Sequence, residues 1–578
     1  MVLASNIISP LGFTVEENLQ AIMAGRTELR LYTGHWGLRE PFVASLFTDR
    51  QRRELHIDGC TMFESIAIQS IRRVVRGLDI DIFSPRTLLI LSTTKGNIER
   101  LEQNCNVHSA EELSPATAAQ HICDAVGITT RPIVVCNACI SGVNAQILAS
   151  RLLQDGAYDN AIVCGAECLG PFVVSGFQSL KSVSQHPCRP FDLGRIGLNL
   201  GECAATIVYS SRGFRRVPEG AHDTGDFWTI TGGAIRNDAM HITNPSPEGE
   251  GCMKAINLAV CDEDKAALTA VSVHGTATMF NDQMESRAIE RAGLSDIPAF
   301  GLKGYLGHTM GANGVAETIL TMAALDRGIV PATKGYEENG VSGRVSISGE
   351  ARPSSGHDFL KIISGFGGNN AAIRYVKKAD QAISDTREYD IRCSHTVEIM
   401  PDKLVLDGNR IEHEAIGDSI LTEMYRRYVG NYPKFFKMDG LSRLAFIAAE
   451  MLLKPSETIL EPTGTEPDAI VLFNHSSSTV SDHEHARLAL CDKSGYASPS
   501  VFVYTLPNIA VGEIAIRHHL TGETALYILP DEDERLMEQI VRTSFHDPDT
   551  KTILTGWVDF ENNRTFRAKL KIIHNTSL

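Results

Sequence analysis

The chain is organised around Val134-Val135-Cys136-Asn137-Ala138-Cys139-Ile140-Ser141-Gly142. Residues 132–138 predict a short buried strand, and residues 141–153 carry apolar side chains at helical spacing. Cys139 therefore falls at a strand-to-helix corner, where unpaired backbone N–H groups and the positive end of the helix dipole favour a thiolate, the nucleophilic form of cysteine. Because most buried cysteines are inert, the corner alone does not distinguish a catalytic thiol from a structural one.

Three later turns follow predicted strands and carry polar or glycine-rich sequences. They are His274-Gly275-Thr276-Ala277-Thr278, Lys303-Gly304-Tyr305-Leu306-Gly307-His308-Thr309 and Ser364-Gly365-Phe366-Gly367-Gly368-Asn369-Asn370. A single histidine at the end of a strand is usually structural. One cysteine and two histidines, each at the exit of a strand, together indicate acyl transfer.

At these residues the chain resembles the β-ketoacyl synthases of the thiolase superfamily, the decarboxylating Cys-His-His condensing enzymes. The family's nucleophile corner, His-Gly-Thr-x-Thr turn, Lys-x-x-x-Gly-His-Thr turn and Gly-Phe-Gly-Gly loop occur here in the family's order. The resemblance covers residues 1–378. It implies an α/β chain with the thiolase-like five-layer αβαβα fold, whose N-terminal half (1–215) carries the nucleophile and whose C-terminal half (216–378) carries the two histidines.

Residues 379–578 have an organisation of their own. Four pairs of segments correspond in character, the segment of the first half being named first: 58–59 and 439–440, 87–91 and 469–473, 132–135 and 499–503, and 161–165 and 525–530. This pairing places Leu506 opposite Cys139. We therefore predict an additional thiolase-like half domain at 379–578, a degenerate and non-catalytic copy of the N-terminal half. An unrelated α/β appendage with similar strand–helix punctuation is the alternative.

The resemblance implies a 3-oxoacyl-[acyl-carrier-protein] synthase, an acyltransferase of fatty acid or of polyketide- or polyene-type biosynthesis. Cys139 would take an acyl group as a thioester. His274 and His308, as neutral imidazoles, would stabilise the enolate formed when a malonyl thioester loses carbon dioxide, and the carbanion would attack the acyl-cysteine. We expect no cofactor and no metal.

Further residues have roles in this prediction. The backbone N–H groups of Cys139 and Phe366 would form the oxyanion hole, and the resemblance makes Phe366 the gate to the acyl pocket. Thr276 and Thr278 are expected to bind the pantetheine arm of the substrate. Ala277 stands where the family usually has glycine.

Lys303 has two interpretations. It lies near the histidines and tunes their charge, as the resemblance implies, or it is a structural lysine paired with Glu285 or Glu317. Asp282 and Glu285 follow the first histidine turn on a predicted helix and are interpreted as orienting groups.

Related activities are distinguished by single residues. A thiolase would carry a second catalytic cysteine in its last loop, and residues 365–370 contain none. An initiating, coenzyme-A-primed synthase would use one histidine and one asparagine, which His308 contradicts. The alternative function is a non-elongating partner, either a chain-length factor or a malonyl-decarboxylating subunit, but a chain-length factor would lack Cys139.

Composition bounds the partners and the location. The 578 residues are enough for two or three domains, and 43% apolar with 21% charged residues is typical of a soluble globular protein. A net charge of −16 argues against nucleic acid, and the expected partner is an acyl carrier protein, acyl- and malonyl-loaded. The 13 cysteines show no paired metal spacing and predict a reduced, cytoplasmic protein. No apolar run approaches about 18 residues, so no membrane insertion is expected. We expect a homodimer, or a pseudo-dimer formed through the C-terminal half copy.

Overall fold

The computed structural model describes residues 1–103, 109–211, 226–379, 389–453, 466–491 and 497–577. The predicted boundary between residues 215 and 216 lies outside this set. The boundary at 378 and 379 falls at the end of a strand, so the division into three parts at these positions stays a prediction.

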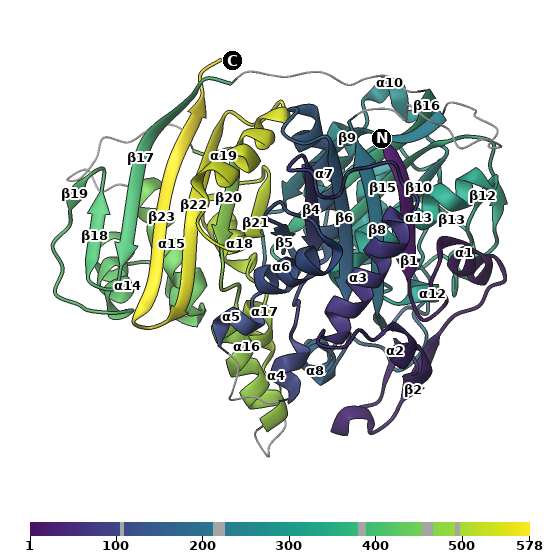
Figure 1. The fold of residues 1–578 in the computed structure, drawn as a ribbon, viewed down its shortest axis with the longest axis horizontal. Helices are drawn as coiled ribbons and strands as arrows, with labels where there is room; N and C mark the ends of the chain where they lie inside the picture. Colours follow the sequence, from purple (N-terminus) through teal and green to yellow (C-terminus); the bar gives the residue numbers. More distant parts are fainter. Residues whose placement is uncertain (104–108, 212–225, 380–388, 454–465, 492–496, 578) are drawn as a thin grey trace.

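A mixed sheet of twelve strands runs through the molecule (Figure 1). In spatial order its strands are β1 (Val2–Ile8), β8 (Cys203–Ser210), β6 (Asn160–Glu167), β4 (Thr87–Ser92), β5 (Ile133–Val135), β21 (Thr524–Ile528), β20 (Ala469–Asn474), β22 (Thr552–Asn562), β23 (Thr565–Asn575), β17 (Ile391–Met400), β18 (Lys403–Leu406) and β19 (Asn409–Arg410). The central strands are apolar and buried on both faces, as expected for strands covered by helices on both sides.

A second sheet of six strands carries the later turns. Its order is β13 (Ser346–Ile347), β11 (Pro298–Phe300), β10 (Ala270–Ser272), β15 (Asp358–Gly365), β16 (Asn369–Ala379) and β9 (Asp226–Asn237). Two small sheets complete the strands: β12 (Ile329–Val330) with β14 (Arg352–Pro353), and β2 (Leu29–Tyr32), β3 (Phe42–Ser45) and β7 (Leu200–Gly201).

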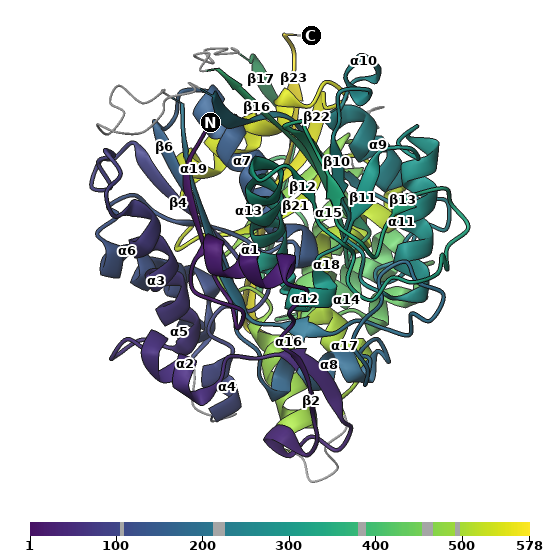
Figure 2. The ribbon, with the colours of Figure 1, turned by 90° about the vertical axis from the view of Figure 1, so that its right-hand side faces the viewer.

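Helices fill the layers around these sheets. Helices α7 (Ser141–Gln154) and α13 (Asn313–Asp326) contact both large sheets and lie between them (Figure 2). Helices α3 (Met62–Val75) and α6 (Pro115–Val126) cover the outer face of the large sheet. Helix α9 (Glu250–Ala259), with α11 (Met279–Arg291) packed on it, covers the outer face of the second sheet. Residues 1–379 thus have the five-layer thiolase-like fold that the sequence predicts.

The remaining helices lie in connections or in the C-terminal part. They are α1 (Val15–Met23), α2 (Asp49–Leu55), α4 (Glu99–Gln103), α5 (Ala110–Leu113), α8 (Pro171–Ser179), α10 (Asp262–Lys265), α12 (Lys303–Leu306), α14 (Ser419–Met424), α15 (Gly440–Leu453), α16 (Thr479–Ala486), α17 (Pro499–Tyr504), α18 (Ile509–His518) and α19 (Glu534–Thr543).

The large sheet has the same strand arrangement on both sides of its centre. Outward from β5 come β4, β6, β8 and β1, and outward from β21 come β20, β22, β23 and β17. In both series the first three strands run parallel and the next two are antiparallel. Strands β5 and β21 pair antiparallel, with Val135 opposite Tyr527. The C-terminal part is therefore an additional thiolase-like half, joined edge to edge to the first.

The strand order corrects two of the predicted correspondences. Residues 499–503 lie in helix α17, and the counterpart of β5 is β21, which was expected to match β6. Leu506 is therefore not opposite Cys139. Cys139 lies four residues beyond the end of β5 (139 − 135), and the same step beyond β21 (528 + 4) leads to Glu532. Pro499 occupies the first helical turn, where its missing N–H costs nothing, and a run as short as Val501-Phe502-Val503 does not by itself distinguish strand from helix.

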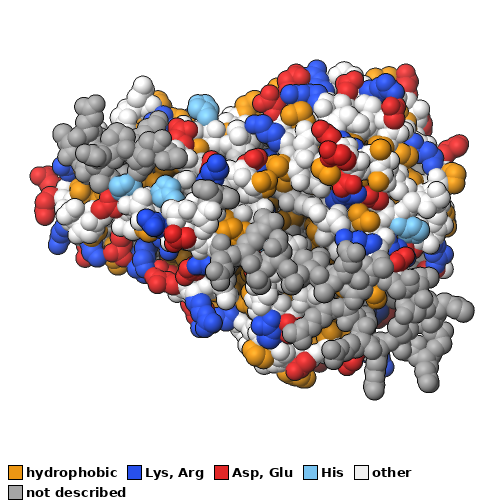
Figure 3. Space-filling model, turned by 90° about the horizontal axis from the view of Figure 1, so that it is seen from above, with side chains coloured by type: hydrophobic (Ala, Val, Ile, Leu, Met, Phe, Trp, Pro, Cys, Tyr) orange, Lys and Arg blue, Asp and Glu red, His pale blue; other side chains and the backbone are white. Residues whose placement is uncertain are grey.

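The remaining observations concern the surface charges, the helices and the cysteines. Acidic and basic side chains lie intermingled on the face drawn in Figure 3. Among the described residues, no helix combines the length and the apolar character needed to cross a membrane. In the described part of the chain eleven cysteines are free, whereas Cys491 is disulfide-bonded, so the expectation of reduced cysteines is wrong at that position.

Candidate active site

Cys139 lies in a tight turn at the start of α7. Residues Ala138–Ile140 form one 3-10 turn, and Ala138 has a φ of 49°, a left-handed conformation that costs free energy in a residue with a Cβ. The Ser141 hydroxyl accepts from the backbone N–H of Asn137 (2.8 Å) and donates to the carbonyl of Ala138 (2.6 Å). These bonds hold the strained turn and present the thiol beyond the strand end.

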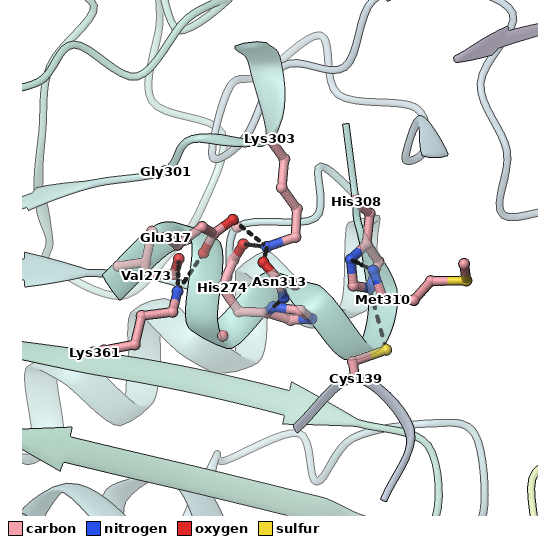
Figure 4. A network of polar contacts seen from close by, with 12 residues as sticks. Cys139, Val273, His274, Gly301, Lys303, His308, Met310, Asn313, Glu317 and Lys361 are labelled. Carbon is pink, nitrogen blue, oxygen red and sulfur yellow. Dashed lines mark hydrogen bonds and ion pairs between the residues drawn. The ribbon is translucent and has the colours of Figure 1, made fainter. Parts of the chain in front are cut away.

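The two predicted histidines meet this thiol (Figure 4). His308 Nε2 lies 3.1 Å from Cys139 Sγ, and the rings of His274 and His308 are 5.1 Å apart and nearly perpendicular. One potential ligand or proton-carrying atom of each of these three residues lies within 4.8 Å of the other two. Cys139 therefore forms one compact group with two histidines that lie 135 (274 − 139) and 169 (308 − 139) positions further along the chain.

Neighbouring groups fix the tautomer of each ring. The backbone N–H of Met310 donates to His308 Nδ1 (3.2 Å), so a neutral His308 carries its proton on Nε2. Lys303 donates to Asn313 Oδ1 (3.1 Å), which turns the Asn313 amide nitrogen toward His274 Nδ1 (3.4 Å). Both imidazoles thus present an Nε2–H donor.

The charge state of the rings agrees with this arrangement. Burial holds the pKa of His274 and of His308 well below the usual value, and the nearby ammonium groups of Lys303 and Lys361 lower both further. Both histidines are therefore neutral at physiological pH, as the sequence analysis expected of hydrogen-bond donors to an enolate.

Lys303 belongs to a buried ion-pair group. Its ammonium donates to the carbonyl of His274 (2.5 Å) and to Glu317 (3.0 Å), whose other oxygen accepts from Lys361 (2.5 Å). Lys303 therefore lies beside the histidines and is also paired, and its partner is Glu317. Glu285 instead accepts from the backbone N–H groups of His274 and Gly275, which orients the first histidine turn.

The protonation of Cys139 differs from the expectation. Burial raises the pKa of the Cys139 thiol to about 12, although Lys303 and hydrogen bonds from the backbone N–H groups of Cys139 and Phe366 lower it. The prediction of a resting thiolate is therefore wrong, because removing the sulfur from water outweighs the helix terminus. The same two N–H groups were predicted as oxyanion donors, and both face the sulfur.

A cavity of about 330 Å³ leads from the surface to the thiol. Cys139, His274 and His308 lie on its wall together with Thr276 and Thr278, whose hydroxyls are 2.9 Å apart. This volume lies in the range of small-molecule sites. The predicted substrate-binding threonines thus share one cavity with the predicted catalytic residues.

A second, much smaller cavity also reaches Cys139 and Phe366. It has room of about 20 Å³, little more than one water molecule needs, and Cys139 and Phe366 line both cavities. Phe502 and Leu506 of the C-terminal part close it, together with Phe177. Phe366, the predicted gate, thus lies on the walls of both cavities, as Phe177 does, and its role as a gate stays a prediction.

Sequence reasoning missed several residues of the site. Lys361 could have been noticed as a lone lysine in the apolar strand Phe359-Leu360-Lys361-Ile362-Ile363. Asn313 follows the second histidine turn, but nothing in its local sequence distinguishes it from a helix-start residue. The C-terminal residues that reach the pocket carry no signal in sequence, because only the fold brings them there.

Comparisons with known proteins agree with this geometry. Residues 83–212 match the family described as "Beta-ketoacyl synthase, N-terminal domain", and residues 227–337 match "Beta-ketoacyl synthase, C-terminal domain". The chain is 30% identical over 275 residues to the tetracenomycin polyketide synthase ketoacyl synthase alpha subunit of Streptomyces glaucescens, which covers 45% of this chain and 63% of that one. It is 27% identical to 3-oxoacyl-[acyl-carrier-protein] synthase 2 of Synechocystis sp., covering 64% of this chain and 96% of that one.

One solved structure extends the likeness to the C-terminal part. The structure titled "PfaC Keto synthase-Chain length factor" has a TM-score of 0.73 at 15% identity and covers 100% of this chain and 78% of that one. At this identity the likeness concerns the fold alone. It shows that the whole chain, and not only residues 1–379, has a ketosynthase-type architecture.

Proposed function

Because the chain belongs to the β-ketoacyl synthase family, we propose that it is a 3-oxoacyl-[acyl-carrier-protein] synthase that joins a malonyl unit to an acyl group held on Cys139. The observation that carries the proposal is the meeting of one thiol and two neutral Nε2–H donors at the end of a 330 Å³ cavity. The thiol nucleophile suits acyl transfer, and two fixed N–H donors suit the enolate oxygen that decarboxylation produces.

In the first step Cys139 takes the acyl group. Its sulfur attacks the thioester carbonyl, and the N–H groups of Cys139 and Phe366 stabilise the oxyanion. The bond from the carbonyl carbon to the carrier sulfur then breaks, and the proton of the Cys139 thiol leaves with that sulfur. The raised pKa of the thiol makes this proton transfer part of the step and not a pre-equilibrium.

In the second step the malonyl thioester loses carbon dioxide. The bond between its carboxylate and its α-carbon breaks, and the electron pair forms an enolate whose oxygen accepts from the Nε2–H groups of His274 and His308. The α-carbon attacks the acyl carbonyl on Cys139, the carbon–sulfur bond breaks, and the thiolate takes up a proton from water. Lys303 keeps Asn313, and through it His274, in the donor orientation.

The substrates reach the site on an acyl carrier protein, with the pantetheine arm in the 330 Å³ cavity. The paired hydroxyls of Thr276 and Thr278 supply donors and acceptors for the amides of such an arm. A long, flexible arm is needed because the Cys139 thiol lies at the inner end of the cavity.

The C-terminal half copy, in this proposal, acts as a built-in and non-catalytic partner. It occupies the free edge of β5 by pairing with β21, and Phe502 and Leu506 close the acyl pocket. The chain is then a pseudo-dimer, and we expect a single copy of 63.1 kDa in sedimentation equilibrium. A mass of twice that value at micromolar concentration would favour the homodimer.

The experiment that tests the activity separates its two chemical steps. Purified protein is given acyl- and malonyl-carrier, and released carbon dioxide and ketoacyl product are measured for the wild type, Cys139→Ala and His274→Ala. We expect condensation by the wild type only, decarboxylation without condensation by Cys139→Ala, and neither by His274→Ala. Decarboxylation without condensation by the wild type would instead favour the alternative, a malonyl-decarboxylating partner subunit.

A further inference from the structure

The Phe366 loop, residues 364–370, is held from outside its own half of the chain. Within residues 226–379, two short hydrogen bonds hold the loop at Gly367. The Gly367 N–H donates to the carbonyl of Ile242 (2.7 Å), and the Asn237 side-chain amide donates to the Gly367 carbonyl (2.8 Å). Gly367 and Gly368 have φ values of 91° and 79°, which a residue with a Cβ rarely adopts. The loop is thus built to turn sharply behind Phe366.

The carbonyl of Phe366 itself is bound by the C-terminal half. Asn508, fully buried at the start of α18, donates its side-chain amide to this oxygen at 2.9 Å. The peptide that joins Phe366 to Gly367 is therefore held at both ends, its oxygen by Asn508 and its N–H by Ile242. Among the described residues no other donor to the Phe366 oxygen is recorded.

Asn508 makes this contact in place of the one expected from its position. An asparagine at a helix N-cap usually accepts a hydrogen bond from a backbone N–H of the first turn, but α18 has no such side-chain cap, and the Asn508 side-chain oxygen has no partner among the described groups. A local stabilising bond is absent where the amide points to the loop.

Helix α18 also leaves no space beside the loop. A Cβ placed on Gly512, one turn after Asn508, would lie 2.9 Å from the Gly367 oxygen and 3.0 Å from its Cα. Glycine in a helix interior is unfavourable by itself, so this position is occupied for the close approach. The first turn of α18 thus fits directly against the Gly367 backbone.

Phe366 links this contact to the chemistry. Its N–H faces Cys139 Sγ, it lines both cavities, and a Cβ on the preceding Gly365 would lie 3.1 Å from the Cys139 nitrogen. The 366–367 peptide, held at its oxygen and its N–H, fixes the position of the Phe366 Cα, and both the ring and the Phe366 N–H are attached to that Cα.

We propose that Asn508 is a positioning residue for acyl transfer: its hydrogen bond to the Phe366 carbonyl holds the Phe366 N–H in place as an oxyanion donor at Cys139. The inference rests on the proposed function and extends it, since it makes the non-catalytic half necessary for the oxyanion hole. It further requires that decarboxylation, which depends on His274 and His308, be independent of Asn508.

The test uses full-length variants and two kinds of measurement. Asn508→Ala removes the donor, and Asn508→Asp keeps the shape but replaces the donor by an acceptor. Asn474→Ala is the matched control, because Asn474 is equally buried in the same half and, among the described residues, its side chain bonds within that half, to the carbonyl of Ser477 (3.1 Å). Hydrogen exchange of a peptide covering residues 364–370 reports the loop, and single-turnover acyl transfer to Cys139 is compared with malonyl decarboxylation.

We expect both Asn508 variants to exchange the loop amides faster and to transfer the acyl group about tenfold more slowly, the effect of one hydrogen bond, with decarboxylation within twofold of the wild type. Asn474→Ala should match the wild type in both. Wild-type transfer by Asn508→Asp, or an equal fall of both steps in all three variants, would overturn the inference. If the wild type transfers no acyl group but the Asn508 variants still exchange the loop amides faster, the proposed function would be refuted. The contact between Asn508 and the Phe366 loop would then still be established.

Discussion

Phe502 is the side chain whose removal should change the substrate range most. Its buried ring lies 5.4 Å from the ring of Phe177 and 5.1 Å from that of His485, and it rests against the backbone at Gly176. With a cavity of only about 20 Å³ behind Phe366, the wild type has room for little beyond a short acyl group. Phe502→Ala removes the ring that closes this cavity.

The size of the effect follows from the space released. A benzene-sized space takes roughly four methylene groups, and at about 0.8 kcal/mol for each buried CH₂ the gain is at most about 3 kcal/mol, or roughly 200-fold. Part of it is lost because the pocket relaxes, so we expect a rise of tenfold or more in the preference for octanoyl over butyryl carrier. The variant should also unfold about 3–5 kcal/mol more easily, as buried Phe→Ala changes do.

The assay is the rate of acyl transfer to Cys139 for a series of carrier-bound acyl chains. Phe566→Ala is the control, because Phe566 is buried in the same half, stacked on Phe560 at 5.5 Å, and does not line the cavity. It should lose stability without a change in chain preference. An unchanged preference in Phe502→Ala, or the same change in Phe566→Ala, would refute the assignment of this cavity as the acyl pocket.

Three further predictions concern buried charge. Lys95 and Asp482 form a buried ion pair between the two parts of the chain (2.6 Å). Asp482→Leu should lower the free energy of unfolding in urea by about 3–5 kcal/mol, and the double variant Lys95→Met/Asp482→Leu should recover most of this loss. If the single and the double variant were equally stable, the result would argue against the pair. Because burial raises the pKa of Cys139 to about 12, its alkylation by iodoacetamide should increase about tenfold per pH unit from about pH 7 to about pH 9. A plateau below pH 8 would show that the pKa is not raised. Glu317→Gln leaves two buried lysines without their shared anion, so its melting temperature should fall well below that of the wild type, and an unchanged value would contradict the pairing.

The group formed by Cys139, His274 and His308 could be predicted from sequence because each of its members lies in a local motif. Cys139 follows β5 of the large sheet, whereas His274 follows β10 of the second sheet and His308 follows β11 and the short helix α12. Strands β10 and β11 are parallel neighbours, so their exits lie at one edge of the second sheet, and the fold brings that edge to the end of β5. The strands and helices of the first half follow for the same reason, since their periodicity is a property of a few neighbouring residues.

The C-terminal half was harder to interpret because its correspondence to the first half is one of topology and not of sequence. The apolar residues at 499–503 suggested a strand, but the proline at their start fits the first turn of a helix and the strand equivalent to β5 comes later, at β21. The expectation of an additional thiolase-like half was right, the alignment within it was wrong, and its non-catalytic role stays a prediction.

Contacts between distant segments were beyond sequence reasoning. Asn508 meets Phe366 across 142 positions, and Phe502 reaches the pocket by the fold alone. The thiolate prediction failed for a related reason: the helix start at Cys139 is visible in sequence, whereas the burial that raises its pKa exists only in the folded chain.

The most direct test of the account is the intact mass of the protein after incubation with acyl-carrier, for the wild type and Cys139→Ala. We predict one acyl adduct on the wild type, none on the variant, and loss of the adduct with formation of ketoacyl product when malonyl-carrier is added. No adduct on the wild type, or an adduct that persists in Cys139→Ala, would contradict the claim that Cys139 carries the acyl group.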